Sequence, residues 1–171
     1  DGGGAEANLA YVFGTSSCTM TTTREPVFVP GVWGPYFSAM IPGMWLNEGG
    51  QSAAGAAIDH LIEFHPIYAE AHAEASRDNQ SLPAWLAQRA EMKLSGDRNV
   101  ARLAGGLYVV PEFLGNRAPY ADPHTRAVIA GLGMERDLDS LLALYIAGLC
   151  GIGYGLRQIL HAQAEKGAKV D

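Results

Sequence analysis

The stretch Leu9-Ala-Tyr-Val-Phe-Gly-Thr-Ser-Ser-Cys-Thr-Met-Thr-Thr-Thr23 passes from an apolar pentad into a glycine and a run of hydroxyl side chains. The pentad is short and rich in β-formers, so it predicts a strand over 9–13. Gly14 and the hydroxyl residues that follow supply the chemistry of a tight turn. A second strand is predicted over 25–29. The residues between the two strands are therefore either a plain hairpin turn or a phosphate-binding loop.

Gly14-Thr15-Ser16-Ser17 carries the groups that a phosphate loop without a positive charge would use. Glycine lets the backbone approach an anion closely, and successive N–H groups and hydroxyls donate hydrogen bonds. The same residues also form ordinary β-turns, and taken alone they favour the plain turn. Both interpretations stay open on these residues.

The rest of the sequence predicts an α/β domain. In order, the patterns predict a third strand near 39–46, a helix over 52–64, a polar helical insertion over 67–102, a strand over 106–110, a loop over 111–123 and a long helix over 137–166. We interpret the insertion as part of one domain covering 1–171. Three strands before the first helix indicate a mixed sheet covered by helices rather than a doubly wound parallel sheet.

Two glycine-rich segments are further candidates for ligand contacts. Gly49-Gly50-Gln51-Ser52-Ala53-Ala54-Gly55-Ala56-Ala57 opens the predicted helix, where free N–H groups and the helix dipole favour an anion. A tightly packed helix start capped by Ser52 explains these residues equally well. The last helix contains four interior glycines, each of which costs about 1 kcal/mol relative to alanine. They favour close packing against another element over a ligand contact; they are Gly148, Gly151, Gly153 and Gly155.

Composition excludes several classes of function. A net charge of −6 leaves no basic patch for nucleic acid, although backbone N–H groups can still bind a small anion. Cys18 and Cys150 form no Cys-x-x-Cys pair and are interpreted as free thiols in a reducing compartment. The five histidines lack the spacing of a metal site, and no Gly-x-x-x-x-Gly-Lys-Ser/Thr P-loop occurs. No membrane-spanning run and no signal peptide are recognised, so a cytoplasmic protein is expected.

Several long motifs in order resemble the FGGY family of carbohydrate kinases, and within it the pentulose kinases similar to D-ribulokinase. The resemblance covers nearly the whole chain except 67–102. The motifs are Phe13-Gly-Thr-Ser-Ser-Cys18, Phe28-Val-Pro-Gly-Val-Trp-Gly-Pro-Tyr-Phe37, Trp45-Leu-Asn-Glu-Gly-Gly-Gln-Ser52, Pro111-Glu-Phe-Leu-Gly-Asn-Arg-Ala-Pro119 and Ala121-Asp-Pro123.

The resemblance implies an actin-like ATPase (ribonuclease-H-like) fold, with this chain as the first part of the second, nucleotide-binding lobe. It implies ATP and Mg²⁺ as cofactors, a small-molecule sugar as substrate and the remaining kinase lobe as partner; a homodimer is left open. The implied ATP-binding residues are Gly14, Thr15, Ser16, Gly55 and, with less support, Asp59. The family's catalytic aspartate belongs to an Asp-Ala-His-like segment ahead of the Gly-Thr-Ser loop. Asp1-Gly2-Gly3 does not match it, so no catalytic residue is assigned within this chain.

The expected function is ATP-dependent phosphorylation of a ketopentose such as D-ribulose by a full-length kinase. The chain is expected to be a fragment of that kinase, and the isolated 171 residues are expected to be inactive. One alternative is a non-catalytic actin-like module that binds nucleotide or a protein partner. Another is a kinase for xylulose, ribitol or glycerol.

Overall fold

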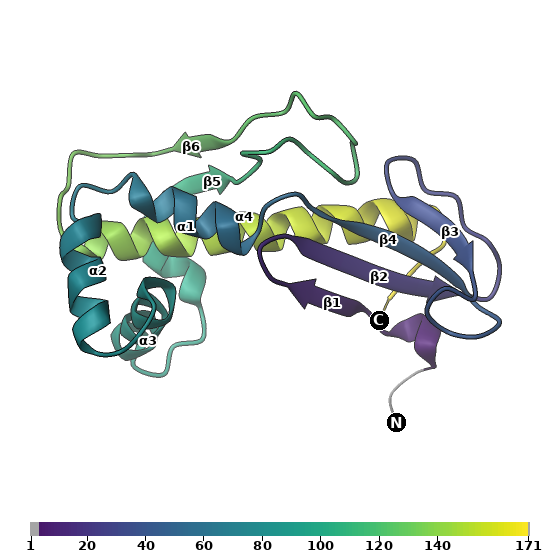
Figure 1. Cartoon of the computed structure of the whole chain (residues 1–171), viewed down its shortest axis with the longest axis horizontal. Coiled ribbons are helices and arrows are strands. Elements are labelled where there is room, and N and C mark those ends of the chain that lie inside the picture. The colour runs from purple at the N-terminus through teal and green to yellow at the C-terminus, as the bar shows by residue number, and fades with distance from the viewer. Residues whose placement is uncertain (1–3, 171) are drawn as a thin grey trace. The chain divides into compact units, whose positions relative to one another are not determined.

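The computed structural model describes residues 4–170, which form two compact units (Figure 1). The first unit contains the chain up to Gly55, Glu112–Arg126 and the residues from Gly153 onward. The second unit contains Ala56–Pro111 and Ala127–Ile152. The two units are described separately below.

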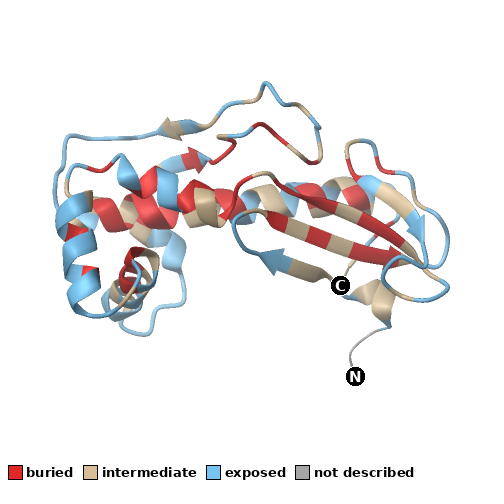
Figure 2. Ribbon diagram, in the orientation of Figure 1, coloured by how far each residue is buried: buried red, intermediate tan, exposed pale blue. Residues whose placement is uncertain are grey.

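A four-stranded sheet forms the frame of the first unit. Its strands are β1 (Ala10–Phe13), β2 (Ser17–Thr23), β3 (Trp33–Phe37) and β4 (Trp45–Gln51), in the order β1-β2-β4-β3. A short 3₁₀ turn, η1 (Ala5–Ala7), precedes them. All the pairings between these strands are antiparallel. The sequence predicted a mixed sheet, but these four strands include no parallel pair. The central strands β2 and β4 are the most buried (Figure 2).

The hydroxyl run forms a strand, which the sequence pattern assigned to the turn. Threonine is β-branched and favours a pleated, half-buried surface, so Ser17–Thr23 becomes β2 and the turn shrinks to Gly14–Ser16. The strand predicted over 25–29 is wrong. Pro26 and Pro30 have no N–H to contribute to a sheet ladder, and Val29 instead packs into a small core cluster with Ile159.

The third predicted strand, near 39–46, is also misplaced, because 39–44 belong to the turn between β3 and β4 and only its last two residues lie in β4. Ser38 adopts a positive φ of 54° and its N–H donates to the carbonyl of Met44 at 2.7 Å. Of the glycine-rich segment expected to open a helix, Gly49 and Gly50 lie inside β4, whereas Gly55 is the first residue of α1. A Cβ at Gly49 would come within 2.5 Å of the Ile159 side chain, so the close packing of this face requires a glycine.

The second unit is mostly helical. Its helices are α1 (Gly55–Glu63), α2 (Tyr68–Arg77), α3 (Leu82–Leu94) and the 3₁₀ helix η2 (Val100–Ala104). The strands β5 (Tyr108–Val110) and β6 (Val128–Ala130) form an antiparallel pair. The first residue of α1, Gly55, belongs to the first unit. Helices within 67–102 and a strand ending at Val110 are confirmed, whereas β6 was not predicted. The Ser81 hydroxyl caps α3 by accepting from the Ala84 N–H at 3.4 Å, as its helix-start pattern indicates. That this region is an insertion within one domain stays a prediction.

Helix α4 (Leu138–Glu165) confirms the long helix predicted near the end of the chain. Asp137 caps it by accepting from the Ser140 N–H at 2.8 Å. In the second unit, a Cβ at Gly148 would lie 2.6 Å from Leu61 Cδ2, and one at Gly151 would collide with the Val109 carbonyl. These glycines therefore serve close packing, as predicted.

By length and composition alone α4 could cross a membrane, which differs from the expectation that no such run exists. Its most apolar 18-residue window has a mean hydropathy of 1.4, and half of that window is buried. Leu141, Ile146 and Ile159 are fully buried within the compact units. This burial fits a core helix of a globular protein.

We expect Leu61→Ala to lower the free energy of unfolding by about 2–5 kcal/mol, because Leu61 is 0% exposed and its removal leaves a cavity beside Gly148. Leu114→Ala is the matched control, since Leu114 is 67% exposed. The control should change the free energy by no more than about 0.5 kcal/mol. Urea unfolding of both variants measures the difference; equal losses would contradict the assigned core.

Candidate functional site

The hairpin turn between β1 and β2 consists of Gly14, Thr15 and Ser16. The Gly14 N–H donates to the Ser16 carbonyl at 2.9 Å, which closes the turn. Gly14 and Thr15 are exposed, and Ser16 is half-buried. The turn therefore presents its backbone to solvent at one end of the sheet.

Two hydrogen bonds fasten this turn to the chain at the beginning of α1. The Ala54 N–H donates to the Thr15 carbonyl at 2.8 Å, and the Gly55 N–H donates to the Gly14 carbonyl at 2.8 Å. A Cβ at position 55 would lie 2.7 Å from the Gly14 carbonyl oxygen, so only glycine permits this approach. The structure thus brings Gly14, Thr15, Ser16 and Gly55 together, as the sequence predicted.

The turn keeps several hydrogen-bond donors available. Within residues 4–170, the N–H groups and hydroxyls of Thr15 and Ser16 make no hydrogen bond. Ser17 differs from its neighbours: it is 1% exposed and its hydroxyl donates to Gln51 Oε1 at 3.0 Å. The donors that could reach an anion therefore belong to Thr15 and Ser16, and the Ser17 hydroxyl stabilises the β2–β4 pair.

The sequence analysis also considered Asp59 and the residues before the first strand as candidate site residues. Asp59 is exposed on α1, one turn after Gly55, and belongs to the second unit, so it is not part of the described constellation. Asp1, to which the sequence gives no catalytic role, lies outside the described residues. Within residues 4–170 no three or more His, Cys, Asp or Glu side chains cluster as metal ligands.

A second constellation, which we call the Arg117 cluster, consists of Arg117, Glu48, Cys18 and Trp33 in the first unit. Arg117 Nη2 donates to Glu48 Oε1 at 2.8 Å, and Nη1 donates to Cys18 Sγ at 3.7 Å. The guanidinium carbon lies 4.3 Å from the centre of the Trp33 ring. Sequence reasoning gave these residues no role. The available signal was the presence of Glu48 and Arg117, two opposite charges, in two of the motifs.

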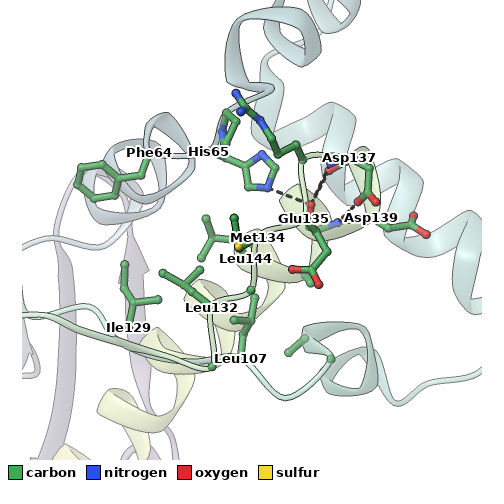
Figure 3. Close-up of a pocket in the computed structure, with 18 residues that line it drawn as sticks. Phe64, His65, Leu107, Ile129, Leu132, Met134, Glu135, Asp137, Asp139 and Leu144 are labelled. Atoms are coloured by element: carbon green, nitrogen blue, oxygen red, sulfur yellow. Dashed lines mark hydrogen bonds between the residues drawn. The ribbon is translucent and has the colours of Figure 1, made fainter.

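A cavity of about 690 Å³ lies in the second unit and contains none of the predicted site residues (Figure 3). Leu107, Ile129, Leu132 and Met134 supply apolar walls. His65 lines it too; its Nε2 lies 3.0 Å from the Ser140 hydroxyl.

Burial lowers the pKa of His65 below its usual 6.5, and the Asp137 carboxylate opposes this shift. The folded protein therefore holds the imidazole neutral under conditions in which the unfolded chain already binds a proton. As the pH falls through about 6.5, the unfolded chain takes up more protons and the folded protein loses stability.

We expect His65→Gln to reduce the loss of stability between about pH 7.5 and 5.5, because the variant removes the titrating group. Urea unfolding midpoints at a series of pH values measure this. His161→Gln is the control, since its side chain is 74% exposed. An unchanged pH dependence in His65→Gln would show that His65 does not titrate differently in the two states.

Comparison with known sequences identifies relatives along almost the whole chain. The C-terminal domain of the FGGY family of carbohydrate kinases matches residues 9–171. An FGGY carbohydrate kinase domain-containing protein of Homo sapiens is 43% identical over 164 residues, covering 96% of this chain and 30% of that protein. A D-ribulokinase of Saccharomyces cerevisiae is 36% identical over 173 residues, covering 100% of this chain and 24% of that protein. The chain thus spans about 30% or less of these relatives.

Solved structures share its fold. A xylulose kinase of Rhodospirillum rubrum superposes with a TM-score of 0.71 at 19% identity, covering 97% of this chain and 29% of that one. A Plasmodium falciparum glycerol kinase with ADP gives a TM-score of 0.63 at 17% identity, covering 96% of this chain and 29% of that one. The fold is that of actin-like ATPases, which confirms the expected fold class. The chain belongs to the FGGY family of carbohydrate kinases and matches its C-terminal domain.

Proposed function

We propose that the full-length protein containing this chain is an ATP-dependent carbohydrate kinase that phosphorylates a ketopentose such as D-ribulose. Membership of the FGGY family supports the kinase, and the similarity to a protein named D-ribulokinase over the whole chain supports the substrate. The observation that carries the proposal is the Gly14–Ser16 turn, whose free donors are held in place by the beginning of α1.

In this proposal the turn holds phosphate oxygens of ATP. Thr15 and Ser16 donate from their N–H groups and hydroxyls, and Gly14 lets the backbone approach the phosphate. Gly55 fixes the turn, and Asp59 is the more distant candidate for a nucleotide contact. Phosphoryl transfer depends mainly on positioning and on stabilising charge, so donors that are fixed before the substrate arrives suit this chemistry.

The remainder of the kinase supplies the other parts of the reaction. Mg²⁺ bound with ATP would neutralise phosphate charge, and its ligands are assigned to no residue of this chain. A carboxylate elsewhere in the protein would take the proton of the sugar hydroxyl. Closure of the two lobes would exclude water from the reaction. The free thiols Cys18 and Cys150 fit the cytoplasmic location that we propose.

The proposal is tested by a coupled ADP-release assay on the full-length protein with a panel of ketopentoses and polyols. We expect ADP release to be stimulated most by a ketopentose. Stimulation by glycerol or ribitol instead would support kinase activity but contradict a ketopentose as the substrate. ADP release that no sugar or polyol stimulates would favour a non-catalytic nucleotide-binding module. The 171-residue chain by itself should be inactive in either case.

We expect Thr15→Val in the full-length enzyme to lower turnover with D-ribulose by at least about tenfold, because the variant removes a hydroxyl donor while nearly keeping the shape of the side chain. Thr23→Val is the control at the other end of β2, where the hydroxyl donates to the Glu25 carbonyl at 2.7 Å. Steady-state kinetics measure both variants. If Thr15→Val turns over like the wild type, the turn does not contact the transferring phosphate.

We expect Gly55→Ala to raise the KM for ATP severalfold, because its new methyl group would displace the Gly14 carbonyl and with it the turn. Gly153→Ala is the matched control, since nothing lies within 4 Å of its added Cβ. That control should leave the KM unchanged and stabilise α4 by about 1 kcal/mol. Equal values of KM in the two variants would disprove the role given to the Gly55–Gly14 contact.

A further inference from the structure

Four fully buried side chains of the first unit carry polar atoms that find no hydrogen-bond partner within residues 4–170. The atoms are Thr19 Oγ1, Thr21 Oγ1, Asn47 Oδ1, and both Oε1 and Nε2 of Gln163. Each of these residues is at most 1% exposed, so bulk water does not reach them. A buried donor or acceptor without a partner destabilises the folded state, and native proteins almost always provide one. These atoms therefore require a partner inside the protein.

Three of the four side chains share one face of the sheet. Thr19 and Thr21 are two residues apart on β2 and therefore point to the same side. Asn47 on β4 lies directly opposite Thr21 in the antiparallel ladder, and directly opposite residues also share a face. Gly49 lies opposite Thr19, and a Cβ added to it would come within 2.8 Å of Thr19 Oγ1. The hydroxyls and the Asn47 amide thus form one polar group on the covered face of the sheet.

The fourth side chain, Gln163, approaches this group from α4. The helix crosses β4 in a regular register: an added Cβ at Gly155 would meet the Gln51 side chain, and one at Gly49 would meet Ile159. Four residues of helix advance about 6 Å, and two residues of strand advance about 7 Å. The next step of the same register places Gln163 over the ladder pair formed by the threonine and asparagine described above.

The unpartnered atoms include both donors and acceptors. Asn47 Nδ2 donates to the Val27 carbonyl at 2.9 Å, which fixes the amide orientation and leaves Oδ1 as an acceptor. Gln163 offers one donor and one acceptor whichever way its amide is turned. A metal cation cannot accept a hydrogen bond from an amide N–H, and these four side chains include no carboxylate to balance a positive charge. Water both donates and accepts, so it suits every atom of the group.

We propose that an ordered water molecule is bound between Thr21, Asn47 and Gln163 and links β2, β4 and α4. It accepts hydrogen bonds from Gln163 Nε2 and the Thr21 hydroxyl and donates one to Asn47 Oδ1, and about three bonds are typical of a buried water. Thr19 Oγ1 and Gln163 Oε1 are the candidates for contacts with a second water. The site is enclosed by the first unit itself, and the inference does not depend on the proposed kinase function.

The first test compares Thr21→Val with Thr22→Val in the full-length protein, since valine keeps the branched shape and removes the hydroxyl. Thr22 is the matched control: it is 2% exposed, and its hydroxyl donates to the Ala5 carbonyl at 3.0 Å. Both variants should raise the equilibrium constant for urea unfolding about fivefold, because each loses one hydrogen bond. If Thr21→Val lowers that constant instead, its hydroxyl has no partner and the inference is wrong.

The second test counts the internal water in solution. Oxygen-17 magnetic relaxation dispersion detects water molecules that stay inside a protein for longer than its tumbling time. Gln163→Met removes the amide with little change of shape and should lower the number of such waters by at least one, whereas Thr22→Val should leave the number unchanged. If Gln163→Met folds poorly, Thr21→Val is the second variant and should also lower the dispersion. Equal dispersion in the wild type and these variants overturns the inference.

A high-resolution crystal structure of the full-length protein separates water from the other partners. We expect electron density for a water oxygen within about 2.7–3.2 Å of polar atoms of Thr21, Asn47 and Gln163. A direct hydrogen bond between the Asn47 and Gln163 amides, with no water between them, would contradict the inference. So would an ion surrounded by about six or more oxygen atoms at about 2.3–2.6 Å, which is the coordination of a calcium ion.

Discussion

Two backbone hydrogen bonds attach the turn that we propose as a phosphate loop: Ala54 N–H to the Thr15 carbonyl and Gly55 N–H to the Gly14 carbonyl, both 2.8 Å. They join the turn of a β-hairpin to the beginning of a helix 40 residues later in the chain. The turn uses its carbonyls for this attachment, and its remaining N–H groups face outward. The contact depends on a glycine at position 55, where any Cβ would press against the Gly14 carbonyl. The orientation of the loop is therefore a property of the folded domain.

The sequence predicted element types better than their positions. The long apolar pattern of α4 is local and strong, and the helix it predicts was confirmed. The predicted positions of the second and third strands were wrong, in part because hydroxyl residues occur both in turns and in strands. A run of threonines reads as a turn when it follows a glycine, yet their β-branched side chains stabilise a strand once neighbouring strands are present. Gly49 and Gly50 were predicted to precede a helix, but they lie within β4, where close packing across the sheet requires glycine.

The sequence could assign candidate site residues only where a single motif contains them, and their role in binding phosphate stays a prediction. Gly14, Thr15 and Ser16 are consecutive, and family resemblance pointed to them together with Gly55. The Arg117 cluster joins residues 99 and 69 positions apart in the chain, and no local pattern reports such contacts. The register of β2 and β4 and the loop that carries Arg117 bring these side chains together.

The glycines of α4 have a consequence for the order in which the chain folds. Four interior glycines weaken the intrinsic tendency of this segment to form a helix by about 4 kcal/mol relative to alanine. That deficit is recovered only when Leu61 and Val109 lie against Gly148 and Gly151, and Gln51 lies against Gly155. An isolated α4 would spend little time helical despite its length. Helix formation in this segment therefore depends on contacts with the earlier elements, so that the helix and these contacts form cooperatively.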